Sequence, residues 1–571
     1  MSFLRKKSYV HTPSIKPFIG LTMHEMLEER VKKNPDREML VFVGDNERVT
    51  FVEFKKKIIN LAAGILLKLG LRRGDLIAVI GHNHIEWPLI TGAASAIGVG
   101  VVNLLIGHTH QTLMKVMSQV SCKALFITRS PDTLYPMVCE MIPELSESIP
   151  GDLNSKQFPY LKKVIAAGLN CKSGMLNFDD IAIPGREMEV AKAAKKVTMN
   201  DICHITMTSG TTGSPKLVPY THFQTLNGNS FLPDQFDEKQ INKIAFVGNI
   251  AYISTTLLSQ VWPLFFGTTS VFCSPAYNFE KFIQASEAER CTFLSLSIDG
   301  VVNLLYNPIC DKYDLSSFKS GFIAGSPIPP ALIFEMNTKF GIRLLNFYGS
   351  TEATIISSLT VDDSPDFWNT SGRTLPNTEL LVVDEKGCPV ELSEKGEIWV
   401  RSPVAFRGYY GDTEKTKQTI TENGWIKTGD VGKLTADGYL KIVGRTKDTI
   451  FRSGSNIHPS DVECVIVTHP AISNVQVLPI PDYRIGEDVS ACVVLNEGYD
   501  ITEEELKTFF EGEVATGKMS DFILPSYFLI FDSFPYGASG KVDRKKLQEL
   551  AIGRVKLPET PYVEKRVELH D

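Results

Sequence analysis

The chain has 571 residues, of which 43% are hydrophobic and 22% charged, and its 59 basic and 66 acidic side chains give a net charge of −7. These proportions are ordinary for a globular protein with a large core, and they argue against disordered, collagen-like and polytopic membrane proteins. The acidic balance lacks the basic stripe of a nucleic-acid binder, so we expect no nucleic-acid partner.

The ten cysteines are scattered, without a Cys-x-x-Cys pair or a cysteine–histidine cluster at zinc-ligand spacing. This pattern argues against a disulfide scaffold and structural zinc, and it is typical of a reducing compartment. Two uncharged runs, 87–107 and 245–279, contain many small or polar residues. They are interpreted as buried helix and strand, and no transmembrane segment is expected.

Short apolar runs alternate with helical patterns through the first 440 residues. Strands are predicted at 76–81, 122–128 and 160–168, and a helix rich in small residues at 87–98. This alternation favours an α/β architecture with largely parallel sheets. The stretch 183–200, which contains Pro-Gly and mixed charges, is interpreted as a linker.

The pattern becomes shorter and more compact beyond 444–447, as in a small α+β domain. Ser460 with Glu463 and Thr502 with Glu505 match the capping box that opens a helix. Strand-like segments lie between these boxes at 475–480 and 489–495. A domain boundary is therefore predicted near 444–447.

A run of small residues follows a strand predicted at 201–206. Residues 206–216 read Thr-Met-Thr-Ser-Gly-Thr-Thr-Gly-Ser-Pro-Lys, which leaves backbone N–H groups and hydroxyls available to surround an anion. The loop is not a Walker A motif, because no Gly-Lys-Ser/Thr occurs in it. Residues 217–220 are expected to be extended, and Thr221 with Gln224 to cap a helix.

This loop resembles the signature of the adenylate-forming superfamily, which includes acyl-CoA synthetases, peptide-synthetase adenylation domains and firefly-type luciferases. Four more segments resemble family motifs in the expected order, and together they cover nearly the whole chain: Tyr348-Gly349-Ser350-Thr351-Glu352, Trp425-Ile426-Lys427-Thr428-Gly429-Asp430, Gly444-Arg445-Thr446-Lys447-Asp448 and Gly540-Lys541-Val542-Asp543-Arg544. Segments 8–14 and 21–37 are similar to the animal medium-chain acyl-CoA synthetase family member 2 group.

The resemblance implies an α/β fold with two domains. A large N-terminal adenylate-forming domain at 1–443 would contain two α/β subdomains and a small β-barrel, and a mobile α+β domain at 448–571 would follow a hinge at 444–447. Lys447 matches the pivot of that hinge. Gly454 and Ser455 match the loop that approaches coenzyme A, although Ser-Gly-Ser-Asn departs here from the commoner Gly-Gly-Glu-Asn.

The family's chemistry implies a role for each motif. Attack of a carboxylate on the α-phosphate of ATP requires charge neutralisation and in-line positioning. The residues expected to be catalytic are Lys541, Thr351 and Glu352, and Glu352 is also expected to hold Mg²⁺. The nucleotide site is expected to comprise Thr208, Ser209, Gly210, Thr211, Thr212, Gly213, Ser214, Pro215, Lys216, Gly325, Ser326, Tyr348, Asp430, Arg445 and Lys541. Glu463, near the CoA loop, is interpreted only as a capping residue.

The acid to be activated should be apolar. The stretch 245–279 offers no carboxylate to pair with a substrate ammonium, which disfavours an amino acid. Tyr252, Leu257, Leu258 and Trp262 are expected to line the acyl pocket. Tyr252 falls where many acyl-CoA synthetases have histidine, which could alter how the carboxylate is oriented or merely reshape the pocket.

The expected activity is therefore ATP- and CoA-dependent ligation of a fatty acid, of medium length by resemblance. The expected location is mitochondrial, or alternatively cytoplasmic, and the expected state is a monomer or homodimer. Three alternatives stay open: a ligase for another apolar or aryl acid, a luciferase-like adenylate oxygenase, and a non-catalytic protein that retains the fold. Kinase-type phosphoryl transfer is disfavoured, because Walker and protein-kinase signatures are missing.

Overall fold

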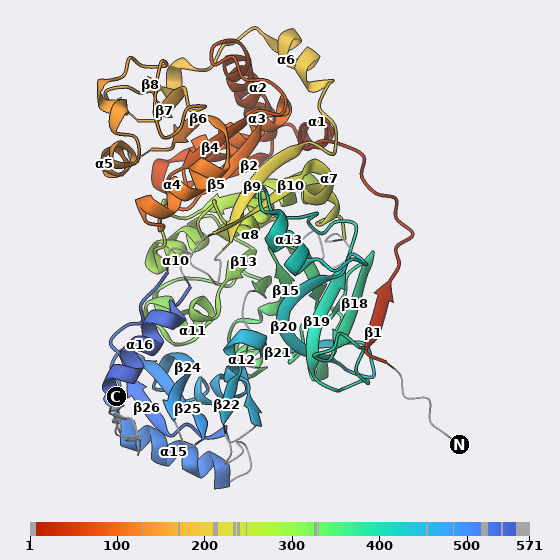
Figure 1. Ribbon diagram of the computed structural model, residues 1–571, viewed down its shortest axis with the longest axis vertical. Coiled ribbons are helices and arrows are strands. Elements are labelled where there is room, and N and C mark those ends of the chain that lie inside the picture. Colours follow the sequence, from red (N-terminus) through yellow and green to blue (C-terminus); the bar gives the residue numbers. More distant parts are fainter. Residues whose placement is uncertain are drawn as a thin grey trace, which may run out of the picture.

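The computed structural model describes residues 7–129, 131–168, 172–208, 215–231, 236, 240–246, 248–324, 328, 330–452, 455–482, 485–515, 523–537 and 541–555. The strands of these residues form four sheets. Figure 1 shows two of them in the upper and central body, a third beside them and a fourth, built from the C-terminal residues, below.

The first sheet is parallel except where β9 meets β10. Its strands, in spatial order, are β10 (Lys216–Thr221), β9 (Ile202–Thr208), β5 (Gly100–Leu104), β4 (Leu76–Ile80), β6 (Cys122–Ile127), β7 (Lys163–Ala166) and β8 (Leu176–Asn177). Every residue of β4 is buried, as expected for a parallel strand covered on both faces. The strands predicted at 76–81, 122–128 and 160–168 are confirmed as β4, β6 and β7.

The second sheet is parallel at its centre and antiparallel at both edges. Its strands are β17 (Arg373–Thr374), β16 (Thr354–Ser358), β15 (Arg343–Ser350), β14 (Ser320–Ala324), β13 (Phe293–Leu296), β11 (Lys243–Phe246), β12 (Thr269–Phe272), β2 (Glu38–Phe42) and β3 (Glu47–Thr50). Because parallel strands end at the same edge, the loops after β11, β13, β14 and β15 gather there.

Helices pack on both faces of this second sheet. Its inner face and the first sheet share one large core with α1 (Met23–Lys33), α2 (Phe51–Leu67) and α3 (Glu86–Ala96). Its outer face is covered by α10 (Phe279–Ala288), α11 (Ile298–Tyr306) and α12 (Pro330–Phe340). The helix predicted at 87–98 is α3, and α4 (His110–Gln119) and α5 (Pro131–Met141) follow along the chain.

The third sheet, which corresponds to the expected small barrel, is antiparallel throughout. Its strands are β1 (Tyr9–Thr12), β18 (Thr378–Val383), β19 (Gly396–Arg401), β20 (Ile426–Leu434) and β21 (Leu440–Arg445). The short helix α13 (Thr413–Thr419) precedes β20. Figure 1 shows β1 at the outer edge of this sheet, beside its partner β18. The two strands are far apart in the sequence.

The fourth sheet contains only residues beyond the predicted boundary. It is formed by β23 (Ser455–Ile457), β22 (Ile450–Arg452), β25 (Gly486–Leu495), β24 (Ile472–Asp482) and β26 (Tyr527–Ile530), with α14 (Pro459–Ile466), α15 (Glu503–Ala515) and α16 (Arg544–Arg554). The architecture is therefore α/β, with a large N-terminal domain and a small C-terminal one. The capping box of Thr502 and Glu505 opens α15 as predicted.

The capping box predicted at Ser460 and Glu463 is wrong. Helix α14 starts at Pro459, and His458 precedes it without a side-chain cap. The Ser460 hydroxyl donates instead to the Val443 carbonyl, while Glu463 Oε1 accepts from the Val477 backbone N–H at 2.8 Å and from Arg544 at 3.3 Å. Both side chains therefore bond to residues distant in the sequence instead of capping the helix.

The linker predicted at 183–200 contains a helix, α6 (Glu187–Ala194), which is a second correction. Acidic residues occupy its first turn and Val190 anchors it in the core, which offsets the Pro-Gly that precedes it. The uncharged runs form helices and strands of the core, as predicted. Among the described residues, no helix is long and apolar enough to cross a bilayer, and no cysteine is paired.

Candidate active site

Motifs from three sheets meet at the edge where the parallel strands of the second sheet end. Helix α7 (His222–Asn227) follows β10 and is opened by the predicted capping box of Thr221 and Gln224. The Tyr220 hydroxyl donates to the Thr351 carbonyl, and Gln224 Nε2 donates to the Ala405 carbonyl at 2.7 Å. The first of these bonds holds β10, the strand that leaves the small-residue loop, against the Tyr-Gly-Ser-Thr-Glu segment.

That segment forms the tight turn between β15 and β16. A Cβ atom on Gly349 would lie 2.2 Å from the Thr354 carbonyl oxygen, so only glycine allows this close approach. Thr354 has a φ of 61°, in the left-handed region that β-branched residues rarely adopt. A register shift between Tyr348 and Gly349 redirects the side chains that follow. Thr351 and Glu352 are thus presented by a sharply constrained turn.

Asp430 is the buried acid of the site, with 6% of its surface exposed. It accepts a hydrogen bond from the Tyr348 hydroxyl at 2.8 Å on Oδ2 and one from Arg445 Nε at 2.9 Å on Oδ1. Arg445 is its cross-strand partner in β21, and Gly429, at φ +70°, turns the chain just before it. Each carboxylate oxygen retains a further lone pair, so Asp430 can still accept from a ligand hydroxyl.

The pKa values around Asp430 follow from burial and from its negative charge. Burial, and then Asp430, raises the pKa of Tyr348 well above its usual range, which keeps the phenol protonated as a donor. Loss of hydration by itself lowers the pKa of Arg445, but the charge and hydrogen bond of Asp430, with smaller contributions from Asp448 and Tyr348, raise it overall. Arg445 is therefore a fixed cation at neutral pH.

A chain of hydrogen bonds connects the end of the small-residue loop to Glu352. Lys216 Nζ donates to the Tyr409 hydroxyl at 3.2 Å, and that hydroxyl donates to Glu352 Oε1 at 2.7 Å. The Lys216 ammonium also lies 4.8 Å from the centre of the Tyr409 ring. Sequence reasoning missed Tyr409, because the Gly-Tyr-Tyr-Gly stretch around it has no distinctive spacing.

Glu352 is suited to bind the expected Mg²⁺ ion as a single carboxylate ligand. Within the described ranges, no three His, Cys, Asp or Glu side chains are clustered so that they could hold a metal. Mg²⁺ is commonly bound by one or two carboxylates, with substrate phosphates and water completing its shell. A carboxylate connected to Lys216 through the Tyr409 hydroxyl suits an ion held mainly by a nucleotide.

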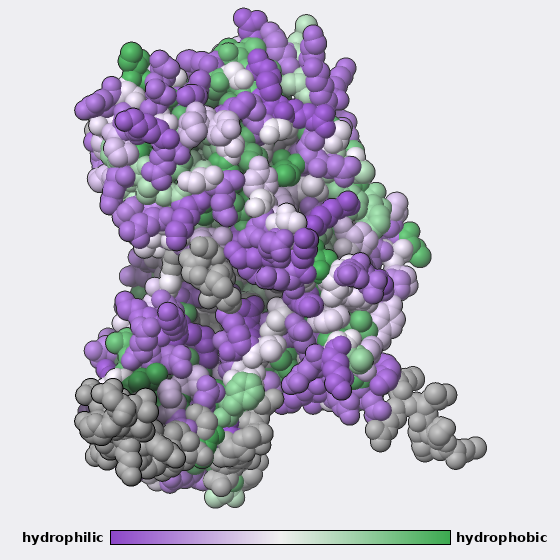
Figure 2. Space-filling view, in the orientation of Figure 1, coloured by the Kyte–Doolittle hydropathy of each residue, from purple (hydrophilic) through white to green (hydrophobic). Residues whose placement is uncertain are grey.

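Lys541, in the C-terminal domain, lies close enough to Asp430 and Arg445 for their charges to act on it. Its loop is closed by a hydrogen bond from the Gly537 N–H to the Lys541 carbonyl at 2.8 Å, and α16 begins three residues later. Lys541 keeps contact with solvent, although the surrounding atoms remove much of the hydration of its ammonium group. Figure 2 shows a mostly hydrophilic face that is hollowed where the C-terminal elements meet the body. Loss of hydration, and then the charge of Arg445, lowers the pKa of Lys541, against the opposing effect of Asp430.

The residues expected to line the acyl pocket do not all face the same way. Tyr252 is half-buried, and burial raises its pKa to about 12. It begins a helical segment made of α8 (Ile253–Thr256), the π-helical turn η5 (Leu257–Val261) and α9 (Trp262–Phe266). Leu257 packs against Leu226 of α7 and the N-terminal segment, whereas Leu258 and Trp262 belong to the main core.

The remaining predicted residues are only partly described. Thr208 ends β9, Pro215 is buried beside β10, Lys447 is exposed in the short turn after β21, and Ser455 begins β23. The residues that lie outside the described ranges are Ser209, Gly210, Thr211, Thr212, Gly213, Ser214, Gly325, Ser326 and Gly454.

Two family models match the chain, and they define its class. The AMP-binding enzyme model matches residues 27–410, and the model of the AMP-binding enzyme C-terminal domain matches residues 461–541. The chain belongs to the AMP-binding enzyme family. Enzymes of this family use ATP, generally with Mg²⁺.

Relatives within this family are acyl-CoA ligases. The chain is 32% identical to the mitochondrial medium-chain acyl-CoA ligase ACSF2 of Macaca fascicularis, over 95% of this chain and 89% of that protein. It is 31% identical to the putative acyl-CoA synthetase YngI of Bacillus subtilis, over 94% of this chain and 98% of that protein. The protein is therefore assigned to the adenylate-forming ligases of the acyl-CoA synthetase type.

A solved structure confirms the fold. The anthranilate CoA ligase AuaEII, in complex with anthranoyl-AMP, superimposes with a TM-score of 0.81 over 94% of this chain and 98% of that chain, at 21% identity.

Proposed function

We propose that this protein activates a medium-chain fatty acid with ATP, forming an acyl-adenylate and pyrophosphate, and then transfers the acyl group to coenzyme A with release of AMP. The observation that carries the proposal is that Tyr348 and Arg445 both donate to the buried carboxylate of Asp430, whose charge also acts on Lys541. The medium length is supported by the names of the relatives.

The nucleotide would be held from several sides. Residues 208–216 would surround the β- and γ-phosphates, with Lys216 supplying a cation and Glu352 anchoring the Mg²⁺ that neutralises them. Asp430 would accept from the ribose hydroxyls beside Arg445. Tyr348 would stack on adenine, opposite Gly325 and Ser326.

Lys541 would serve the first half-reaction. An ammonium beside the reacting centre stabilises the negative charge that develops as the carboxylate oxygen attacks the α-phosphate. Its lowered pKa means that this charge is lost at a lower pH than for an ordinary lysine. Rotation about Lys447 would then withdraw Lys541 and bring Gly454 and Ser455 to the pantetheine arm.

The direct experiment is a survey of acids with ATP, Mg²⁺ and coenzyme A, read by mass spectrometry of the products. Straight-chain acids from butyrate to hexadecanoate, benzoate and anthranilate are compared. The proposal expects AMP and acyl-CoA with a maximum at medium chain lengths. If thioester forms only from aryl acids, the proposed fatty-acid substrate is wrong. If adenylate forms without thioester, coenzyme A is not the acyl acceptor. ADP as the nucleotide product would overturn the mechanism.

We also infer that the protein works in mitochondria, as the printed names of its animal relatives say of those proteins. The bacterial relative YngI carries no such location, so the inference rests on the animal relatives alone. Immunodetection in fractionated cells tests it: enrichment with mitochondria is expected, and recovery in the cytosol would contradict it.

A further inference from the structure

The first turn of helix α16 carries three consecutive cations, Arg544, Lys545 and Lys546. A helix N-terminus has a partial positive charge, so cations there are unfavourable unless other groups compensate them. The side chain of the N-cap residue, Asp543, accepts from the Lys546 N–H at 3.1 Å. Arg544, which lies three residues after Lys541, finds its partners in other elements of the domain.

The Arg544 guanidinium and the Glu463 carboxylate together complete the edge of β24. Among the described strands, β24 pairs with β25 alone, so one of its sides has no neighbouring strand. The Val477 N–H donates to Glu463 Oε1 at 2.8 Å, and the Val477 carbonyl accepts from Arg544 Nη2 at 2.6 Å. Arg544 Nη1 donates to Gln476 Oε1 at 2.7 Å and to Glu463 Oε1 at 3.3 Å. The pair therefore joins α14, β24 and α16 at one residue of the strand.

The chain between Lys541 and Arg544 is fastened along its length. The Asp543 N–H donates to the Pro535 carbonyl at 2.8 Å. Val542 packs against apolar residues of β24, β25 and α16. Three residues span at most about 10 Å. A shift of the Arg544 backbone would therefore be passed on to the backbone of Lys541.

The same pair lies close to the hinge. Burial lowers the pKa of Lys447, and the charges of Arg445 and Arg544 lower it further. Asp448 opposes that effect. Burial also raises the pKa of Glu463, as does the charge of Asp448. The pair of Glu463 and Arg544 is therefore near the turn about which the C-terminal domain would rotate, as well as near the lysine that this domain presents.

A second pair of the same kind lies at another edge of this sheet. The Ile530 N–H, at the end of β26, donates to Glu503 Oε1 at 3.0 Å, and Arg554 donates to the Ile530 carbonyl. These contacts are exposed, whereas those of Val477 are partly buried. Because Arg554 ends α16, the second pair has the same chemistry as the first and lies farther along the chain from Lys541.

We propose that Arg544 is a positioning residue for adenylation: held by Glu463 and by the edge of β24, it sets where Lys541 stands when the C-terminal domain meets the large domain. This inference rests on the proposed function and adds a determinant of its first half-reaction. Glu463, whose sequence pattern indicated only a helix cap, acts on Lys541 through Arg544. Figure 1 shows α16 at the side of the C-terminal domain that is nearest the large domain.

The test uses Glu463→Gln, which removes the charge and keeps an oxygen for the Val477 N–H, and Arg544→Lys, which keeps the charge and loses the planar fork. ATP–pyrophosphate exchange should fall about tenfold in each variant, with kcat lowered and KM for ATP unchanged. Transfer from supplied acyl-AMP to coenzyme A should be retained. Matched controls are Glu503→Gln and Arg554→Lys, which make the same changes in the second pair and should retain exchange.

A comparison of double variants separates positioning from a structural role alone. When Lys541→Ala is already present, adding Glu463→Gln or Arg544→Lys should leave the residual pyrophosphate exchange unchanged, because both residues act through Lys541. A further tenfold loss in the double variants, an equal loss of the two half-reactions, or the same loss in the two controls would overturn the proposal.

Amide hydrogen exchange gives a readout that does not depend on activity. The Gly537 and Asp543 amides should exchange about tenfold faster in Glu463→Gln and Arg544→Lys than in the wild type and the controls, and unchanged rates would overturn the proposal. A thermal melt identifies the folded variants, and if one of the two does not fold, the other decides. If the wild type shows no pyrophosphate exchange with any acid, the proposed function fails, and the amide rates still decide whether the pair fixes the loop.

Discussion

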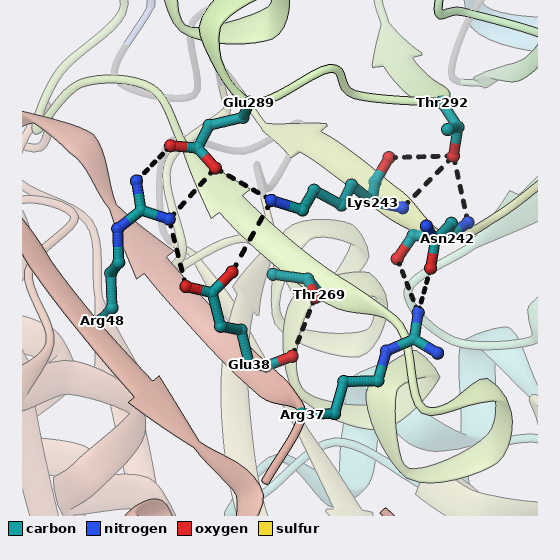
Figure 3. A network of polar contacts seen from close by, with 8 residues as sticks. All are labelled: Arg37, Glu38, Arg48, Asn242, Lys243, Thr269, Glu289 and Thr292. Carbon is teal, nitrogen blue, oxygen red and sulfur yellow. Dashed lines mark hydrogen bonds and ion pairs between the residues drawn. The ribbon is translucent and has the colours of Figure 1, made fainter.

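The two ends of the nine-stranded sheet use charge in different ways. At the amino end, Glu289 accepts hydrogen bonds from Arg48 and Lys243, and Glu38 accepts one from Arg48 and forms an ion pair with Lys243, as Figure 3 shows. At the carboxyl end, Asp430 and Lys216 come from other sheets and Lys541 from the other domain. The first end is held together by ion pairs within one sheet and its adjoining helix, and the second is assembled from separate units.

This difference separates charges that stabilise the fold from charges that serve the proposed reaction. Glu38 and Lys243 are the first residues of β2 and β11, so their ion pair joins parts of the chain that are distant in sequence. Asp430, in contrast, is bonded to Arg445, whose side chain is 51% exposed, and lies near the exposed Lys541. The carboxyl end keeps an open side for ligands.

Of the two ends, the carboxyl end should show the larger effect. Asp430→Asn removes the negative charge that faces Arg445 and Lys541, so we expect kcat/KM for ATP to fall by about 10- to 100-fold. The measurement is steady-state kinetics with varied ATP, together with a thermal melt. An unchanged kcat/KM would show that Asp430 is not part of the nucleotide site.

The matching change at the amino end should affect stability alone. Glu289, whose side chain is 9% exposed, is the anion that Arg48 and Lys243 share. Glu289→Gln removes this anion and should lower the free energy of unfolding by about 1–3 kcal/mol. Urea denaturation measures this loss. Kinetic constants should stay at the wild-type values, and a large loss of kcat/KM would contradict the division between the two ends.

The pH dependence of that loss follows from the pKa of Glu289. Hydrogen bonds from Arg48, and then from Lys243, lower this pKa below its ordinary value of 4.5 despite partial burial. A carboxyl group with a lowered pKa in the folded state stabilises above its unfolded pKa and ceases to do so as the pH falls through the folded one. The stability difference between wild type and Glu289→Gln should therefore be full at neutral pH and shrink in acid. A difference that grows in acid would refute the ion pair.

The smallest expected effect concerns the relay to Glu352. Tyr409→Phe removes the hydroxyl between Lys216 and Glu352 but keeps the ring over which the lysine lies, so we expect the Mg²⁺ concentration for half-maximal activity to rise about fivefold. Glu352→Gln should raise it further. A Mg²⁺ titration measures both, and identical curves for all three proteins would remove Glu352 from the metal site.

Local patterns predicted much of the fold. The continuous apolar run of β4 and the capping pair of Thr221 and Gln224 depend on neighbouring residues only, and both are present as expected. The order of the strands within the sheets could not be predicted in this way, since pairs such as β1 with β18 join residues far apart in the chain.

The errors arose where distant contacts outweighed local ones. Ser460 has the right neighbour for a capping box, but the Val443 carbonyl across the hinge takes its hydroxyl. Glu463, explained from sequence as a cap, bonds to Arg544, three residues after Lys541. Tyr409 entered the site only because the third sheet folds against β10.

The most direct test of the account separates the two half-reactions in Lys541→Ala, with Lys545→Ala as a control on a neighbouring exposed lysine. ATP–pyrophosphate exchange measures adenylation, and thioester formation from supplied acyl-AMP measures transfer to coenzyme A. We expect Lys541→Ala to lose exchange by about 100- to 1,000-fold and to retain transfer, and Lys545→Ala to retain both. Equal loss of both half-reactions in Lys541→Ala, or unimpaired exchange, would contradict it.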